Sequence, residues 1–365
     1  DTYWPLTRGM TANRYADSGF PSSRDWSRNY DYVSGTPASA MIASGRKDAL
    51  SPAEKYDYLM GDDSYTLTRR SWDVPRALGS VPGWAGICDG WSAASISFDE
   101  PVRSITVTGV GDRTIRFFPS DIKGLTALLW AKATGPTNFI GSRCSTVNPG
   151  RDPVGRIVAP ECVDSNPATW HMAVVNQLGL VKKSLIIDTS FNHEIWNFPV
   201  WQYRYTYFNP QTLQPTNNWR DSLARRDRFS IDKFRKYRSP ETEYVVGVSM
   251  FVTHMIELRP SHAEGPRASS KTVHYVYDLE LDANMNIVDG EWYSEVHPDF
   301  IWAPKPGSRA MSVEDPKLAS LEPWTGTGAI PQSWTQLARS ASLRLQPLAA
   351  VVERLVQWSH DGATP

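Results

Sequence analysis

The sequence changes from helical to extended patterns partway along, and this order constrains the fold more than any other feature. Residues 51–60 begin with a capping box and a proline suited to the first helical turn, and residues 119–133 are amphipathic, with Ser120 as the expected cap. Long alternating runs follow at 194–208 and 244–293, and a helix bent at Pro347 closes the chain. Helices and strands that occupy separate parts of a chain predict an α+β fold.

The chain has 365 residues, which is enough for one large domain built from two packed lobes. We expect an irregular N-terminal wrap over 1–50, a catalytic domain over 51–310, and a Pro-rich connection with a C-terminal helix over 311–365. The start of the sequence lacks a signal-peptide pattern, so any such peptide would already have been removed.

Charge and hydropathy argue against two classes of partner. The formal net charge is -1, and binding to nucleic acid phosphates requires a concentrated basic surface. The one basic stretch, 225–238, is interrupted by acidic residues and is expected to be a solvated face. No apolar run reaches the roughly 20 residues of a membrane helix. We therefore expect neither nucleic acid binding nor membrane insertion.

The three cysteines divide into a pair and a single residue. Cys144 and Cys162 lie in a Gly/Pro-rich loop, where a disulfide would close a short ring and add about 3 kcal/mol of stability. Cys88 is then left over, between Gly86 and Gly90, where a loop leads into a predicted helix. A thiol at a helix N-terminus is easier to ionise, which a nucleophile requires. A buried structural cysteine is the alternative interpretation.

A histidine and a carboxylate follow Cys88 along the chain. His171 lies in a run interpreted as a strand, and Asp188 ends the next apolar run, so the two could face each other on adjacent antiparallel strands. Asp188 would then orient the imidazole while the second ring nitrogen serves the thiol. For an isolated histidine near an apolar strand, a satisfied core residue is the competing interpretation.

Several motifs recur in the same order as in a known family. They are CDGWSAAS, FFPSDIKGL, TWHMAVVNQLGL, SLIIDTS, EIWNFPVWQYRYTYF, DLELDANMNIVDGEW and HPDFIW. Over roughly 80–310 the chain resembles the oomycete cell-wall transglutaminases whose surface fragment elicits plant defence, and their bacterial relatives. The resemblance implies a papain-like, transglutaminase-like core with Cys88, His171 and Asp188 as its triad. Phe198 and Trp201 depart from the more polar family pattern in the elicitor segment, so plant recognition is not inferred.

The resemblance implies an enzyme that is secreted, in the cell wall or in the periplasm. Its substrates would be glutamine-bearing proteins or peptides and primary amines, joined as isopeptide bonds through a thioester. The oxyanion would be held by the Cys88 amide and one of Trp84, Trp91 or Gln177, and core packing is the alternative for the two tryptophans. A peptidase, amidase or deamidase with the same triad is the second hypothesis, and a non-catalytic secreted recognition protein is the third.

No metal site is expected from the sequence. Asp282, Asn284 and Asn286 alternate as in a calcium loop, but Ile287 stands where that loop needs glycine, so a hairpin turn is preferred. No cofactor is obligatory, although the resemblance keeps calcium open.

Overall fold

The chain divides into two compact units, each described here by itself. The computed structural model describes residues 1–133, 135–159, 162, 165–189, 193–294 and 297–362. Unit 1 comprises Asp1–Pro136, Glu257–Ser269 and Pro304–Pro365, and unit 2 comprises Thr137–Ile256 and Ser270–Ala303. The chain therefore passes from unit 1 to unit 2, returns briefly to unit 1, completes unit 2 and ends in unit 1.

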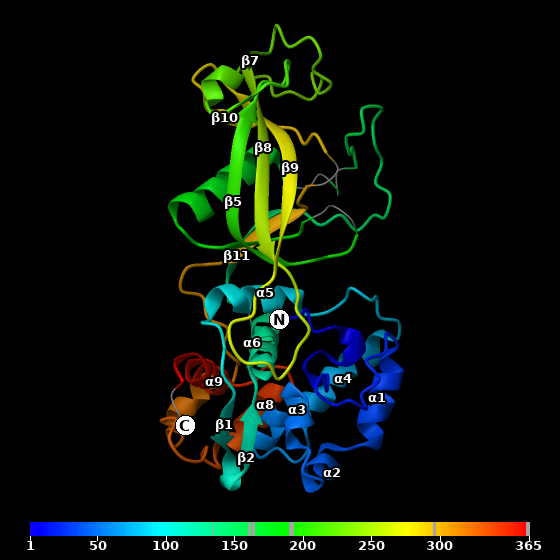
Figure 1. Cartoon of the computed structure of the whole chain (residues 1–365), viewed down its shortest axis with the longest axis vertical. Helices are drawn as coiled ribbons and strands as arrows, with labels where there is room; N and C mark the ends of the chain where they lie inside the picture. Colours follow the sequence, from blue (N-terminus) through cyan, green and yellow to red (C-terminus); the bar gives the residue numbers. More distant parts are fainter. Residues whose placement is uncertain (134, 160–161, 163–164, 190–192, 295–296, 363–365) are drawn as a thin grey trace. The chain divides into compact units, whose positions relative to one another are not determined.

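Unit 1 is mainly helical (Figure 1). Its α-helices are α1 (Trp26–Gly35), α2 (Ala38–Ala43), α3 (Pro52–Leu59), α4 (Thr66–Leu78), α5 (Cys88–Ser97), α6 (Pro119–Ala133), α8 (Trp334–Ser342) and α9 (Ala349–Asp361). Short 3-10 turns are η1 (Leu6–Arg8), η2 (Met10–Ala12), η3 (Lys47–Ala49), η4 (Val110–Asp112) and η8 (Asp315–Ser320). Two strands, β1 (Ile105–Thr108) and β2 (Thr114–Phe117), form an antiparallel hairpin.

Local signals explain several of these elements. The capping box at α3 is confirmed, because the Ser51 hydroxyl accepts from the Glu54 amide while the Glu54 carboxylate accepts from the Ser51 amide. The first 50 residues show no sustained period, yet they contain α1, whose first turn is capped by the Asp25 side chain. At the C-terminus the predicted bent helix is two helices, since Leu345 takes a left-handed φ of 60° shortly before Pro347.

Unit 2 is built on one antiparallel sheet (Figure 1). Its main strands are β3 (Thr137–Gly141), β4 (Leu185–Ile187), β5 (Phe198–Phe208), β8 (Tyr244–Met255), β9 (Ser270–Leu281), β10 (Ile287–Asp289) and β11 (Phe300–Pro304). Their order across the sheet is β10-β9-β8-β5-β4-β11-β3. The two-residue strands β6 (Pro215–Thr216) and β7 (Ala224–Arg225) pair with β5 and β8, and a 3-10 turn, η7 (Trp219–Ser222), lies between them.

One face of this sheet is covered by a helix that the sequence had indicated as a strand. Residues 167–174 form α7 (Pro167–Val174), which continues as a single π-helical segment, η6 (Val175–Leu180). Trp170 and Val174 of α7 pack with Tyr275 and other inward side chains of β5, β8 and β9. In Figure 1 this green helical segment lies behind β5.

His171 consequently lies on α7 and not on the antiparallel sheet, which corrects the expectation that both His171 and Asp188 would be on strands. Asn166 and Pro167 explain the difference, because the Asn166 side chain accepts from the amides of Ala168 and Thr169 and Pro167 occupies the first turn. This capping determines the conformation despite the β-branched residues that follow. Asp188 directly follows β4, as predicted for the end of an apolar run. No helix among the described residues is long and apolar enough to span a membrane.

Candidate functional site

Cys88 is the first residue of α5. The helix begins after Ile87 without a side-chain cap, and the Ile87 carbonyl accepts from the Trp91 amide. The partial positive charge of a helix N-terminus stabilises a thiolate there. The side chain is buried, with 6% of the residue exposed, and it lies outside the disulfide. The predicted helix start is therefore confirmed.

The glycines around Cys88 are required by close packing within unit 1. A Cβ on Gly90 would lie 2.1 Å from the carbonyl oxygen of Ala127 on α6, and one on Gly86 would lie 2.4 Å from the carbonyl oxygen of Tyr3. Both distances are far below van der Waals contact. The glycines thus permit close packing of α5 against α6 and the N-terminal segment.

The other two cysteines form the predicted disulfide. Cys144 and Cys162 are bonded and almost completely buried. They close the loop that precedes α7. This leaves Cys88 as the one cysteine of the sequence outside a disulfide.

His171 projects from α7 into the aromatic core of unit 2. Its Nδ1 atom lies 2.7 Å from the hydroxyl of Tyr277, and its ring packs edge-on against Tyr205. Burial lowers the pKa of His171 to about 4, so the ring is neutral at pH 7. When Nδ1 carries the proton and donates to Tyr277, Nε2 is left as the basic nitrogen.

Asp188 is completely buried at the end of β4. Its carboxylate accepts a hydrogen bond of 3.0 Å from the backbone amide of Trp196. The next residue, Thr189, accepts from the hydroxyl of Tyr275, whose pKa is raised well above its usual value by burial and then by the negative charge of Asp188. His171 and Asp188 thus approach β9 at two adjacent inward-facing tyrosines, Tyr277 and Tyr275.

The three candidate oxyanion donors belong to different units. Trp84 and Trp91 lie in unit 1 with Cys88, and Trp91 is buried one helical turn after the cysteine. Gln177 lies in unit 2 within η6, where its amide donates to the carbonyl of Ser184 at 3.5 Å. Cys88 likewise belongs to unit 1, whereas His171 and Asp188 belong to unit 2. The triad therefore stays a prediction.

His254, near the end of β8, is a second candidate base. It is 2% exposed, and its Nδ1 atom lies 3.0 Å from the carbonyl oxygen of Met255. A carbonyl only accepts hydrogen bonds, so Nδ1 carries the proton and Nε2 is the basic nitrogen. In the part of the chain that the structure describes, Nε2 is buried without a hydrogen-bond partner. Burial lowers the pKa of His254. Sequence reasoning did not propose His254 as a base, because strand alternation alone does not mark an unsatisfied nitrogen.

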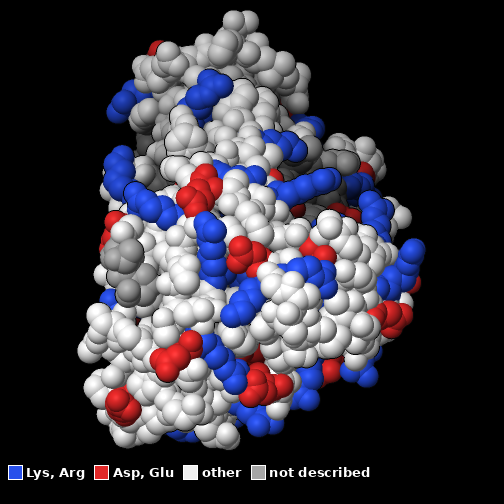
Figure 2. All heavy atoms as spheres, turned by 60° about the horizontal axis from the view of Figure 1, so that its bottom comes forward, with Lys and Arg blue, Asp and Glu red and all other residues white. Residues whose placement is uncertain are grey.

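The basic stretch 225–238 only partly matches its expected role as a solvated face. Arg225 is paired with Asp227 on the surface, whereas the Arg238 side chain is completely buried among Asp232, Asp278 and Glu280. On the face shown in Figure 2, basic and acidic side chains are interspersed and neither sign covers a continuous area.

No cluster of three or more metal-ligating side chains occurs among the described residues. Asp282, of the rejected calcium loop, accepts hydrogen bonds from the backbone amides of Asn284 and Asn286 in the turn between β9 and β10. The preferred interpretation of this segment as a hairpin turn is confirmed. Calcium dependence remains an expectation from the resemblance alone.

Comparison with known proteins gives one family and one similar fold. A family model described as "Transglutaminase elicitor" matches residues 73–319, which include Cys88, His171 and Asp188. The crystal structure of the GP42 transglutaminase from Phytophthora sojae matches 99% of this chain and 89% of that chain, with a TM-score of 0.59 and 20% sequence identity. At this identity the match shows a shared fold. A comparison with curated proteins gave no match.

Proposed function

This chain belongs to the transglutaminase elicitor family, and from that membership we propose that it is a secreted protein-glutamine γ-glutamyltransferase with Cys88 as nucleophile. The observation that carries this proposal is that Cys88, the one cysteine outside the disulfide, is the first residue of α5. The buried disulfide between Cys144 and Cys162 supports an oxidising compartment such as the exterior or the periplasm.

The proposed reaction has two stages, in which His171 is the base and Asp188 the residue that orients it. The Cys88 thiolate attacks the carboxamide carbon of a protein-bound glutamine, and the resulting imidazolium gives its proton to the departing ammonia, which leaves a thioester. The neutral imidazole then takes a proton from an incoming lysine or polyamine amine. That amine attacks the thioester, which forms the isopeptide bond and releases the thiol.

The local geometry supports a proton-transfer role for a neutral histidine. His171 starts neutral at pH 7 because burial lowers its pKa to about 4, so it can accept the proton of the Cys88 thiol. The charged imidazolium would be costly in this aromatic surrounding unless the thiolate accompanies it. His254 is a second candidate for the same role, favoured by the tautomer that the Met255 carbonyl imposes.

One assay tests the function. Dimethylcasein and dansylcadaverine are incubated with the wild-type chain and with Cys88→Ala, and incorporated dansyl and released ammonia are both measured. We expect wild type to incorporate the amine and the variant to lose at least about a thousandfold in rate, as for other removed nucleophiles.

The outcomes separate the three hypotheses. Thiol-dependent ammonia or peptide release without amine incorporation would favour the deamidase, amidase or peptidase. The absence of any thiol-dependent product would favour the non-catalytic recognition protein. Ser95→Ala on the same helix is the control, because the Ser95 hydroxyl donates to the carbonyl of Ser92 one turn earlier. Circular dichroism should confirm that both variants are folded.

A further inference from the structure

Unit 2 contains a pocket of about 280 Å³ beside the disulfide loop. Trp292 and Tyr293 line it as half-buried aromatic walls, and Arg151 and Lys233 lie among its lining residues with exposed side chains. Ligand pockets usually span roughly 300–1,000 Å³. This pocket therefore fits a ligand about the size of one amino acid.

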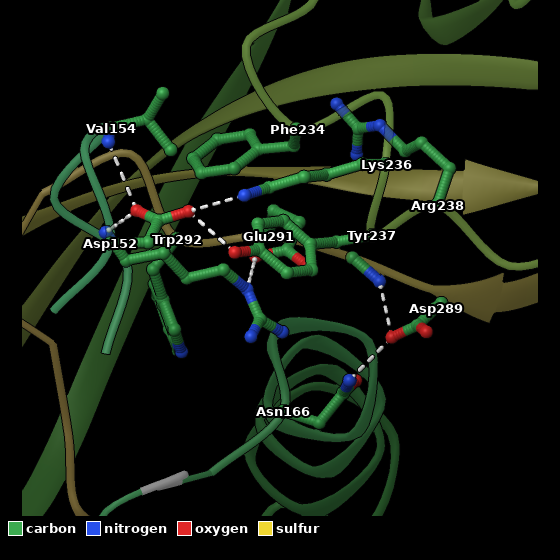
Figure 3. A network of polar contacts seen from close by, with 12 residues as sticks. Asp152, Val154, Asn166, Phe234, Lys236, Tyr237, Arg238, Asp289, Glu291 and Trp292 are labelled. Carbon is green, nitrogen blue, oxygen red and sulfur yellow. Dashed lines mark hydrogen bonds and ion pairs between the residues drawn. The ribbon is translucent and has the colours of Figure 1, made fainter. Parts of the chain in front are cut away.

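The pocket is held by polar contacts between three segments of unit 2 (Figure 3). Asp152 of the disulfide loop pairs with Lys236 at 3.1 Å and accepts from the hydroxyl of Tyr237. Arg156 of the same loop pairs with Glu291 at 2.9 Å. These contacts tie the disulfide loop to residues 233–238 and to the segment after β10, so the pocket is formed before any ligand arrives.

Lys233 differs from three other cations in this region. The cations of Arg156, Lys236 and Arg238 all have carboxylate partners. The Lys233 ammonium instead lies over two rings, 4.6 Å from the centre of Phe234 and 5.5 Å from that of Tyr293. Among the described residues it has neither a hydrogen bond nor an ion pair.

The surroundings of the pocket favour a negative charge near Lys233. Among the lining residues that the structure describes, Arg151, Arg156 and Lys233 are basic and Glu291 is acidic, and burial raises the pKa of Glu291 to about 7. His297 adds no charge at pH 7, because burial lowers its pKa to about 4. Residues 165–167 at the N-terminus of α7 also line the pocket, and the helix dipole adds a positive potential there.

We propose that this pocket binds a carboxylate that carries an aromatic or aliphatic group, as at the C-terminal residue of a peptide. Lys233 pairs with the carboxylate, and the apolar group contacts Trp292. Two contacts hold the orientation of the Trp292 indole: its Nε1 donates to the carbonyl of Ser165 at 2.8 Å, and its ring stacks on His297. The site lies within unit 2 and is independent of the proposed transferase activity.

Calorimetric titration of the full chain with N-acetyl-L-phenylalanine tests the proposal. The matched ligand is N-acetyl-L-phenylalanine amide, which keeps the ring and lacks the charge. We expect the acid to bind at least about tenfold more tightly than the amide, since one ion pair at a partly desolvated site is worth about that factor. Added salt should weaken binding of the acid and leave the amide almost unchanged.

Two variants make the test specific. Lys233→Gln should weaken binding of the acid about tenfold without changing the amide. Arg228→Gln removes the same charge five residues away, at an exposed side chain outside the pocket lining, and should change the affinity less than about threefold. The proposal is overturned if the acid does not bind, if acid and amide bind equally, or if Lys233→Gln binds the acid as wild type does.

Discussion

Replacing Arg238 with Met should destabilise unit 2 more than any surface substitution. The guanidinium is completely buried and donates to three carboxylates, with distances of 2.9 Å to Asp232, 2.6 Å to Asp278 and 3.1 Å to Glu280. Met has a similar length but no charge, so the variant would leave three buried carboxylates without their cation. Breaking a buried ion pair from one side costs about 3–5 kcal/mol.

The cost should depend on pH in a defined direction. Burial already raises the pKa of Asp278 and of Glu280, with Arg238 opposing the increase. Without Arg238 these pKa values rise further, so the folded variant binds protons more tightly than the unfolded chain does. Stability of the variant is therefore retained at acidic pH and lost as pH rises through the range between the unfolded and folded pKa values. The difference from wild type should be largest at neutral pH and shrink towards pH 4.

Differential scanning fluorimetry from pH 4 to 8 measures this effect. For a unit of about 150 residues each kcal/mol shifts Tm by roughly 2–4 °C, so we expect a decrease of about 6–20 °C at pH 7. Arg225→Met is the control, because Arg225 and Asp227 are both more than half exposed at the side chain, at 51% and 59%; its Tm should stay within about 2 °C of wild type. A decrease for Arg238→Met that equals the control, or that does not change with pH, would refute the reasoning.

Three further substitutions test the scaffold. Gly90→Ala places a Cβ 2.1 Å from the Ala127 carbonyl oxygen. We therefore expect the free energy of unfolding to fall by at least about 2 kcal/mol and Cys88 to be alkylated more slowly. A free energy of unfolding equal to that of wild type in urea denaturation would contradict this. Cys144→Ser should lower the free energy of unfolding by about 3 kcal/mol and make the disulfide loop sensitive to limited proteolysis. A loop that stays uncut would argue against a stabilising role for the disulfide. Ser51→Ala removes the hydroxyl that accepts from the Glu54 amide. It should lower the free energy of unfolding by about 1 kcal/mol, measured as a decrease in Tm.

Much of the fold follows from local sequence signals. The capping box at Ser51, the helix that starts at Cys88 and the long strands β8 and β9 were all predicted, because each depends on neighbouring residues. The disulfide was predicted because the two cysteines share one Gly/Pro-rich loop. Membership of the family was also indicated, since the recurring motifs stand in the same order along the chain.

The errors arise where distant residues determine the structure. The segment 169–180 is rich in apolar and β-branched residues, and packing of Trp170 and Val174 against β9 stabilises the helix that Asn166 and Pro167 begin. The partner of His171 is Tyr277, 106 positions later in the sequence, and no local pattern joins them. Arg238 looked like a surface charge because Asp278 and Glu280 lie 40 and 42 positions away.

The choice between His171 and His254 as base depends on which ring nitrogen is available. The partner of His171 is a hydroxyl, which donates or accepts, so either tautomer satisfies the bond to Tyr277. The partner of His254 is a carbonyl, which fixes the proton on Nδ1 and leaves Nε2 basic. A general base needs an unprotonated Nε2, which the carbonyl imposes on His254 and which His171 has when its Nδ1 carries the proton.

Substitution of each histidine by Asn therefore separates the two assignments in the amine incorporation assay. If His171 is the base, His171→Asn should lower the rate at least about a hundredfold, Tyr277→Phe should lower it less, and His254→Asn should leave it within about threefold of wild type. The reverse order would transfer the role to His254 while Cys88 remains the nucleophile. If the rate stays near that of wild type after both substitutions, neither histidine accepts the proton of the Cys88 thiol, and imidazole catalysis by either residue is rejected.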